Sequence, residues 1–189
     1  LLLQSLKDVY DPRFQSILFR SDINALANLI EESQNLYQDF GLYNRAKNDM
    51  TWNFHFGGYL KFAYHEGDFD SFKKRYAYIG IDEVTHIAFD KFKYLVTCNR
   101  NAHNIRNRIW GTCNPDPDSW VATFINWWIG EDGLPIPERD GVMRYCFMEG
   151  DDVNQIVWGD TREEVFQQCK DPILKYWRTE YEQFGSPQD

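Results

Sequence analysis

Apolar residues along the chain form short continuous runs, separated by stretches in which they recur at helical spacing. The run Tyr76–Ile81 is apolar throughout, which is typical of a strand that is buried on both faces of a parallel sheet. Residues 88–100 then carry apolar side chains at helical spacing, and a second apolar strand within 108–115 ends in a small polar cluster. Strand, helix and strand in this order predict two neighbouring parallel strands joined by a crossover helix.

The remaining pattern predicts further helices and strands, and so an α/β protein with a largely parallel central sheet. Before the first apolar run we expect a helix over 1–9, a strand over 15–20, a helix from Ser21 or Asp22 to about Phe40, and a hairpin within 43–64 around Gly57-Gly58. After the second run we expect a helix over 119–129, strands over 142–148 and 155–157, a helix from Thr161 to about Lys170, and another over 173–184.

Length and composition fit one packed domain. The 189 residues are 43% hydrophobic and 17% aromatic, enough for a real core. We expect a single domain over 1–189, with its core at about 1–130 and C-terminal strands and helices at about 142–184. No apolar run approaches the length of a membrane span. The four cysteines form no Cys-x-x-Cys pair, which argues against a zinc site or a disulfide framework.

The formal net charge is −9, and it is uneven. Residues 1–80 carry nine basic and ten acidic side chains, whereas residues 81–189 carry eleven and nineteen. A protein that binds DNA through its phosphates usually presents a basic face, and here only residues 99–108 are locally basic. Arg100, Arg106 and Arg108 are therefore candidate contacts to DNA phosphates. The alternative is a polar connecting loop.

Two acidic residues, Asp82 and Glu83, follow the first apolar strand directly, and Thr112 and Asn114 lie at the end of the second. Ligands of open α/β sheets bind at the carboxyl ends of the strands, so we expect these four side chains to converge on one edge. Two acids beside a hydroxyl and an amide can bind a metal ion, position a water molecule and sense a phosphate. The alternatives are a helix cap for the acids and a turn for Asn114.

Three further residues are candidates because of their positions. His86 follows the acids and can orient Glu83 or bind near a phosphate, although a locally satisfied histidine is the alternative. Arg20 ends a strand on the same sheet edge, and Arg75 precedes the acidic strand. Either arginine can serve as an arginine finger on a transferring phosphoryl group, and Arg75 can also do so in trans across a ring interface. For each arginine the alternative is a solvated surface charge.

The segment Gly80–Ile87 resembles the Walker B segment of large terminase subunits, the ATP-driven DNA-packaging motors of tailed bacteriophages. Thr112–Pro115 and the helix after it are similar to the coupling motif of that family. Residues 17–33 resemble the strand and helix that follow the phosphate loop, and the predicted hairpin within 51–62 resembles the one ahead of Walker B. The resemblance extends from Leu1 to about Asp160, with the segments in the family's order.

The resemblance implies a three-layer P-loop NTPase-like fold that hydrolyses ATP with Mg²⁺. It implies that Asp82 holds the metal, that Glu83 activates the attacking water, and that Thr112 and Asn114 couple hydrolysis to DNA movement. The implied partners are double-stranded DNA, the portal protein, the terminase small subunit and further copies of the chain in a ring. The implied location is the host cytoplasm, without secretion or membrane attachment.

The chain also departs from the family pattern. It contains no Gly-x-x-x-x-Gly-Lys-Ser/Thr, so we expect it to be truncated at the N-terminal strand and phosphate loop, to lack the nuclease domain, and to be inactive as a fragment. Asn114-Pro115-Asp116-Pro117-Asp118 stands in place of the frequent Asn-Pro-Gly-Gly. The alternative functions are another P-loop motor, such as a helicase, and a non-catalytic NTPase-like scaffold or DNA-binding module.

Overall fold

The computed structural model describes residues 1–44, 46, 49–64 and 74–170. The chain divides into two compact units, Leu1–Pro115 and Asp116–Asp189, and each is described by itself. The single domain expected from the sequence, with its core at about 1–130, stays a prediction.

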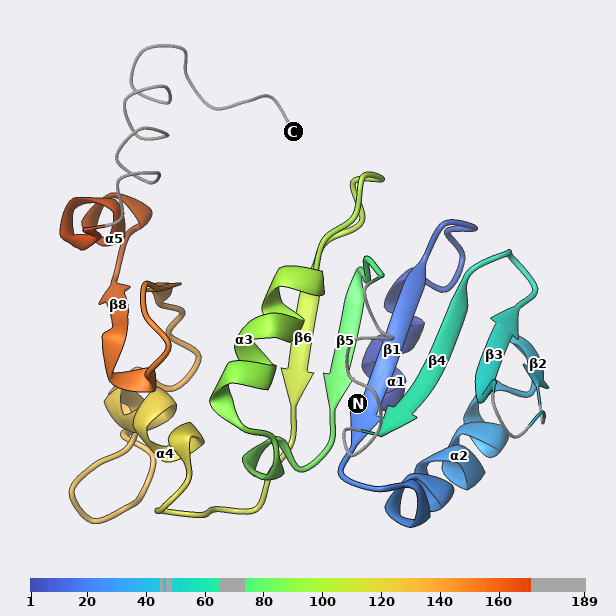
Figure 1. Cartoon of the computed structure of the whole chain (residues 1–189), viewed down its shortest axis with the longest axis horizontal. Coiled ribbons are helices and arrows are strands. Elements are labelled where there is room, and N and C mark those ends of the chain that lie inside the picture. Colours follow the sequence, from blue (N-terminus) through green and yellow to red (C-terminus); the bar gives the residue numbers. More distant parts are fainter. Residues whose placement is uncertain (45, 47–48, 65–73, 171–189) are drawn as a thin grey trace, which may run out of the picture. The chain divides into compact units, whose positions relative to one another are not determined.

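The first unit is built on a six-stranded sheet in the order β2-β3-β4-β1-β5-β6. The strands are β1 (Gln15–Arg20), β2 (Gly41–Asn44), β3 (Thr51–Phe54), β4 (Tyr59–Tyr64), β5 (Tyr78–Ile81) and β6 (Arg108–Gly111). β4, β1, β5 and β6 run parallel, whereas β3 and β2 are antiparallel to their neighbours. The carboxyl ends of β1, β5 and β6 therefore meet at one edge (Figure 1).

Helices lie on both faces of this sheet, as Figure 1 shows with α1 behind it and α3 in front. The helices are α1 (Leu2–Ser5), continued by a 3₁₀ turn over Leu6–Asp8, then α2 (Ile23–Tyr37), a 3₁₀ turn over Val84–His86, and α3 (Phe89–Cys98). α1 and α2 share one face, since the hydroxyl of Tyr37 donates to the carbonyl oxygen of Leu2 at 2.9 Å. The α/β class with a mostly parallel sheet is thus confirmed.

Burial on both faces explains the continuous apolar runs. In β1, Ile17, Leu18 and Phe19 are all fully buried, and because side chains alternate along a strand, both faces of the sheet are covered. Leu18 belongs to the cluster under α1 and α2, together with Phe62 of β4.

Helix α2 begins at the expected cap. The Asp22 carboxylate accepts from the backbone N–H groups of Asn24 and Ala25, each at 2.8 Å. These hydrogen bonds hold the pKa of Asp22 below its ordinary value, and the bond from Ala25 has the largest effect. They lower the pKa because they favour the charged form of the carboxylate. The helix ends at Tyr37, before the expected Phe40, since the chain turns there to enter β2 at Gly41.

The second unit contains α4 (Trp120–Ile125), 3₁₀ turns over Asn126–Trp128, Pro137–Arg139 and Val153–Gln155, a hairpin of β7 (Tyr145–Met148) and β8 (Ile156–Gly159), and α5 (Arg162–Gln168). β7 and β8 pair antiparallel. Aromatic rings pack between these elements, with Trp158 of β8 contacting Phe124 and Trp128 at centroid distances of 5.1 and 5.9 Å. None of the helices that the structure describes is long and apolar enough to cross a membrane.

Most elements lie where the periodicity predicts them. The strand over 15–20, the hairpin around Gly57-Gly58, the crossover helix and the helix after Thr161 are confirmed. Strand β2 was not anticipated as a separate element, because its four residues are too short for a periodic signal. The helix expected over 173–184 lies outside the described residues.

Candidate functional site

The carboxyl ends of β1, β5 and β6 place three polar residues side by side. Phe19 pairs with Ile81, and Ile81 pairs with Gly111. The hydrogen bonding between the strands continues one residue further. The backbone N–H of Asp82 donates to the carbonyl oxygen of Phe19 at 2.8 Å, and that of Thr112 donates to the carbonyl oxygen of Ile81 at 3.0 Å. Arg20, Asp82 and Thr112 therefore occupy consecutive positions across the sheet edge.

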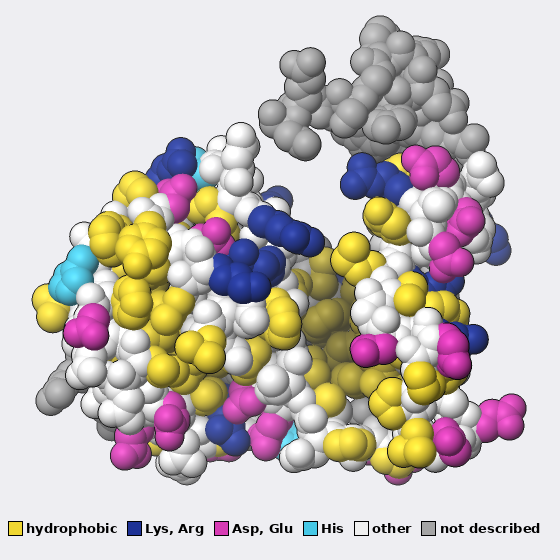
Figure 2. Space-filling model, turned by 180° about the vertical axis from the view of Figure 1, so that it is seen from behind, with side chains coloured by type: hydrophobic (Ala, Val, Ile, Leu, Met, Phe, Trp, Pro, Cys, Tyr) yellow, Lys and Arg dark blue, Asp and Glu magenta, His cyan; other side chains and the backbone are white. Residues whose placement is uncertain are grey.

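The side chains of these three residues contact one another. The Thr112 hydroxyl donates to Oδ1 of Asp82 at 2.6 Å, and Nη1 of Arg20 lies 3.1 Å from Oδ2 of Asp82. Both Asp82 oxygens are thus engaged, one by a hydroxyl and the other by a guanidinium. In Figure 2, acidic side chains gather at the lower edge of this unit, with Lys or Arg and His side chains among them.

Glu83 joins the same group through an unusual backbone conformation. It has φ +56° and ψ +56°, the left-handed region that few non-glycine residues adopt. Its Oε1 lies 3.6 Å from Nη2 of Arg20, and its Oε2 lies 3.6 Å from Nδ1 of His86. Residues held in strained backbone conformations cluster at functional sites, so this geometry marks Glu83 as a functional candidate.

The strain at Glu83 predicts a stability difference. We expect Glu83→Gly to have a free energy of unfolding about 1 kcal/mol higher than Glu83→Ala, because glycine adopts positive φ without a Cβ clash. Both variants lose the carboxylate, so the comparison isolates the backbone, and urea unfolding measures it. At Glu31 in the interior of α2 the order should be reversed, because glycine weakens a helix. Equal stability of the two Glu83 variants would contradict the argument.

Asn114 is not brought into the group of contacts. It is exposed, and no hydrogen bond joins its side chain to any residue within the described ranges. The turn that follows β6 is instead tied back through Thr112, whose carbonyl oxygen accepts from the N–H of Val84 at 2.9 Å. A coupling role for Asn114 stays a prediction.

Arg75 lies at the opposite edge of the sheet from the acids. It precedes the amino end of β5 and borders a hollow of about 110 Å³ that Arg13 and His103 also line. Because parallel strands begin at one edge and end at the other, a residue before the strand cannot meet Asp82 in the same chain. The structure thus corrects the expectation for Arg75 as a finger within one chain, and its role in trans stays a prediction.

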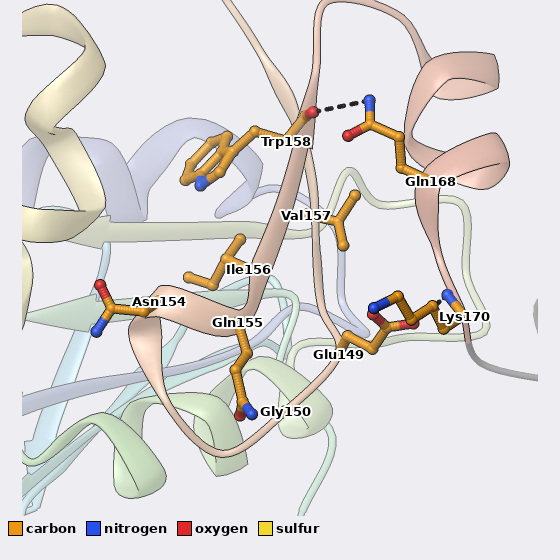
Figure 3. Close-up of a pocket in the computed structure, with 9 residues that line it drawn as sticks. All are labelled: Glu149, Gly150, Asn154, Gln155, Ile156, Val157, Trp158, Gln168 and Lys170. Carbon is orange, nitrogen blue, oxygen red and sulfur yellow. Dashed lines mark hydrogen bonds between the residues drawn. The ribbon is translucent and has the colours of Figure 1, made fainter.

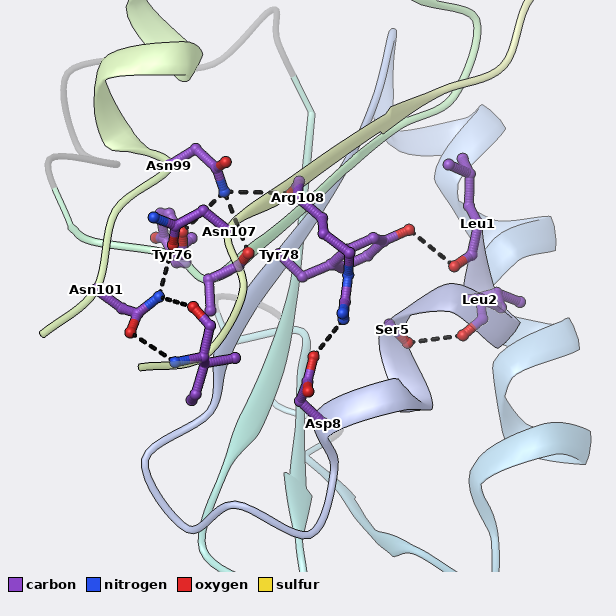
Figure 4. Close-up of polar contacts among 12 residues, drawn as sticks. Leu1, Leu2, Ser5, Asp8, Tyr76, Tyr78, Asn99, Asn101, Asn107 and Arg108 are labelled. Carbon is purple, nitrogen blue, oxygen red and sulfur yellow. Dashed lines mark hydrogen bonds and ion pairs between the residues drawn. The ribbon is translucent and has the colours of Figure 1, made fainter. Parts of the chain in front are cut away.

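The basic stretch over 99–108 is also at that opposite edge, where hydrogen bonds and an ion pair hold it in place (Figure 4). Arg108 forms an ion pair with Asp8, and the side-chain amide of Asn99 donates to the oxygens of Tyr76 and Arg108 at 3.0 and 3.2 Å. Arg108 is therefore a structural residue in this unit. Arg100 and Arg106 are exposed, and their contact with DNA stays a prediction.

The chemistry of the donors suits a hard divalent cation. Carboxylate and hydroxyl oxygens from Asp82, Glu83 and Thr112 are the donor types that Mg²⁺ prefers. Among the described residues no group of three or more His, Cys, Asp and Glu side chains is arranged to hold a metal. Mg²⁺ commonly keeps several waters and uses only one or two carboxylates from the protein, and Asp82 and Glu83 are carboxylates of that kind. A Mg²⁺ role for Asp82 stays a prediction.

The second unit carries a large hollow that sequence reasoning did not anticipate (Figure 3). Its volume is about 900 Å³, and residues of β8, the preceding turn and the segment after α5 line it. The backbone N–H of Lys170 donates to the Glu149 carboxylate, and the Gln168 amide donates to the oxygen of Trp158 at 3.4 Å. None of the predicted site residues lines this hollow. No periodicity or motif signals it, because it arises from hairpin packing.

Comparison with known protein families gives a match that covers most of the chain. Residues 30–184 match the family model described as "Terminase large subunit, T4likevirus-type, N-terminal". The matched range includes Asp82, Glu83 and Thr112 but begins after Arg20. A search of curated proteins found no match to this chain.

Proposed function

The chain belongs to the terminase large subunit family, of the T4-like type, and from this membership we propose that it forms part of a motor that uses ATP to package double-stranded DNA into a phage capsid. Large terminase subunits act in phage DNA packaging. The observation that carries the proposal is the pair of acids at the carboxyl end of the buried strand β5, beside Thr112 at the end of β6. In a P-loop NTPase this edge faces the nucleotide phosphates.

Asp82 is the residue that we assign to the metal. It is held by backbone pairing on one side and by the Thr112 hydroxyl on the other, so its carboxylate has a fixed position. With ATP bound, a Mg²⁺ ion held by Asp82 would supply positive charge that offsets the negative charge developing during phosphoryl transfer. Asp82 would support the ion with one carboxylate, and Thr112 would orient that carboxylate.

Glu83 is the residue that we assign to the attacking water. Its backbone is left-handed directly after β5, and its Oε1 lies 3.6 Å from Nη2 of Arg20, whose guanidinium also contacts Asp82. His86 lies against Oε2 of Glu83, which orients the carboxylate. A carboxylate fixed in this way can accept a proton from water as water attacks the terminal phosphate.

The end of β6 connects the acids to the turn that contains Asn114. Thr112 contacts Asp82 through its hydroxyl and Val84 through its carbonyl oxygen. A shift of Asp82 on hydrolysis would therefore move Thr112 and the turn containing Asn114. This connection supports the proposed coupling of hydrolysis to DNA movement, with the portal protein, the small subunit and a ring of further copies as partners in the host cytoplasm.

A non-catalytic NTPase-like scaffold is the second candidate. The observation that favours it is the ion pairing of both acids with Arg20, because structural acids are commonly neutralised in this way. The family match favours the packaging motor over a helicase.

The experiment that separates the two candidates changes both acids together. In the product of the complete gene, Asp82→Asn with Glu83→Gln is expected to abolish ATP hydrolysis and ATP-driven DNA packaging, measured by phosphate release and by protection of packaged DNA from nuclease. The matched control is Glu31→Gln with Glu32→Gln on the exposed face of α2, which should retain both activities. Survival of both activities in the Asp82, Glu83 variant would show that these acids are not the catalytic residues, whereas absence of ATP hydrolysis in the unchanged protein would favour the scaffold.

A further inference from the structure

One guanidinium group lies between the two carboxylates of the site. Arg20 reaches Asp82 with Nη1 at 3.1 Å and Glu83 with Nη2 at 3.6 Å. The side chains of Arg20 and Asp82 are each 20% exposed, and that of Glu83 is 29% exposed. These contacts are thus shielded from water more than a surface ion pair, and their charges interact more strongly.

The contacts leave no carboxylate oxygen of the pair without a neighbouring polar group. Oδ1 of Asp82 accepts from Thr112, and Oδ2 faces Arg20. Oε1 of Glu83 faces Arg20, and Oε2 faces His86. A cation that approaches Asp82 must therefore displace Arg20 or bind against its positive charge.

The backbone of Arg20 has little freedom to shift. Arg20 ends β1 directly after the fully buried Phe19, so only its side chain can swing. Its Nε is buried without a hydrogen-bond partner among the described residues, which leaves the present position of the group incompletely satisfied.

We propose that Arg20 is a resident counter-ion that competes with the divalent cation for Asp82, so that the cation binds only as Arg20 releases that carboxylate. The proposal rests on the metal role of Asp82 in the proposed function. It assigns Arg20 a positioning role in the nucleotide-free protein, which differs from an arginine finger that acts on the phosphoryl group during transfer. A purely structural ion pair would affect stability but not metal affinity.

The test measures Mn²⁺ binding without nucleotide in the product of the complete gene, by the loss of the electron paramagnetic resonance signal of free Mn²⁺. Arg20→Gln is expected to bind Mn²⁺ at least about tenfold more tightly than the unchanged protein, because a neighbouring positive charge is removed. Arg20→Lys keeps the charge and should stay near the unchanged affinity. Arg13→Gln is the matched control, because Arg13 pairs with Asp11 at 2.9 Å just before the other end of β1.

Adding Asp82→Asn to Arg20→Gln separates failure of this inference from failure of the proposed function. If Mn²⁺ affinity is unchanged or lower in Arg20→Gln, but is lost when Asp82→Asn is added, the competition is wrong and the metal role stands. If Mn²⁺ still binds more tightly after Asp82→Asn is added to Arg20→Gln, or if no variant binds Mn²⁺, then the competition by Arg20 and the metal role of Asp82 are both wrong. A cooperative thermal unfolding transition shows that each variant is folded. If Arg20→Gln does not fold, Arg20→Lys decides the question. A Mn²⁺ affinity raised tenfold in Arg20→Lys would also overturn the competition, because that variant keeps the positive charge.

Discussion

Replacing Glu83 with Gln is expected to lower the rate of ATP hydrolysis by about 10²–10⁴-fold, the range of general base catalysis, while ATP still binds. The amide keeps the size of the side chain and its contact with Arg20, but it cannot take a proton from the attacking water. Binding survives because the proposed metal site depends on Asp82, whose carboxylate still accepts from the Thr112 hydroxyl in this variant.

The measurement is single-turnover hydrolysis in the product of the complete gene, with ATP binding measured separately by a fluorescent analogue. Asp82→Asn serves as the contrast, because it should weaken the Mg²⁺ dependence of binding itself. Glu32→Gln on the exposed face of α2 is the control and should match the unchanged protein. A Glu83→Gln variant that hydrolyses ATP at the unchanged rate would rule out Glu83 as the base.

Replacing Phe62 with Ala is expected to lower the free energy of unfolding by about 3–5 kcal/mol. Phe62 lies on β4, is fully buried, and pairs with Leu18 of β1 in the cluster beneath α1 and α2. Its removal leaves a cavity that the paired strands cannot close, because their backbones are fixed by the sheet on both sides. Since whole domains are stable by only about 5–15 kcal/mol, this change removes a large share of the free energy of unfolding.

Urea unfolding, followed by circular dichroism, measures this effect. Phe56→Ala is the matched control, because Phe56 is 46% exposed and contacts only the ring edge of Tyr10 among the aromatic pairs described. It should cost about 1 kcal/mol or less. Equal losses for the two variants would show that the cluster around Phe62 is not the stabilising core.

The sequence anticipates the elements whose burial is periodic. Gln15–Arg20 and the crossover helix come out as expected, because burial on both faces gives continuous apolar runs and one-sided burial gives helical spacing. The approach of Thr112 to Asp82 follows from the same pattern, since parallel neighbours end at the same edge. Strand β2 escapes prediction because its four residues are too few for a periodic signal.

The site is predicted only in part. Strand order places Asp82, Glu83 and Thr112 together, but it says nothing of how side chains pair within the group. The contacts of Arg20 with both acids and the left-handed backbone of Glu83 leave no periodic signal in the sequence. Arg75 is a candidate because it precedes the acidic strand, but a residue before a strand lies a full strand length from the end of that strand.

Asn99 and Thr112 together have a consequence for how the central strands respond to load. The Asn99 amide ties the entrances of β5 and β6 through the oxygens of Ala77 and Arg108, each at 3.2 Å, and Thr112 ties their exits. Two strands joined by side-chain hydrogen bonds at both ends resist separation, so a force applied to β5 or to β6 should move the two strands together as one rigid body.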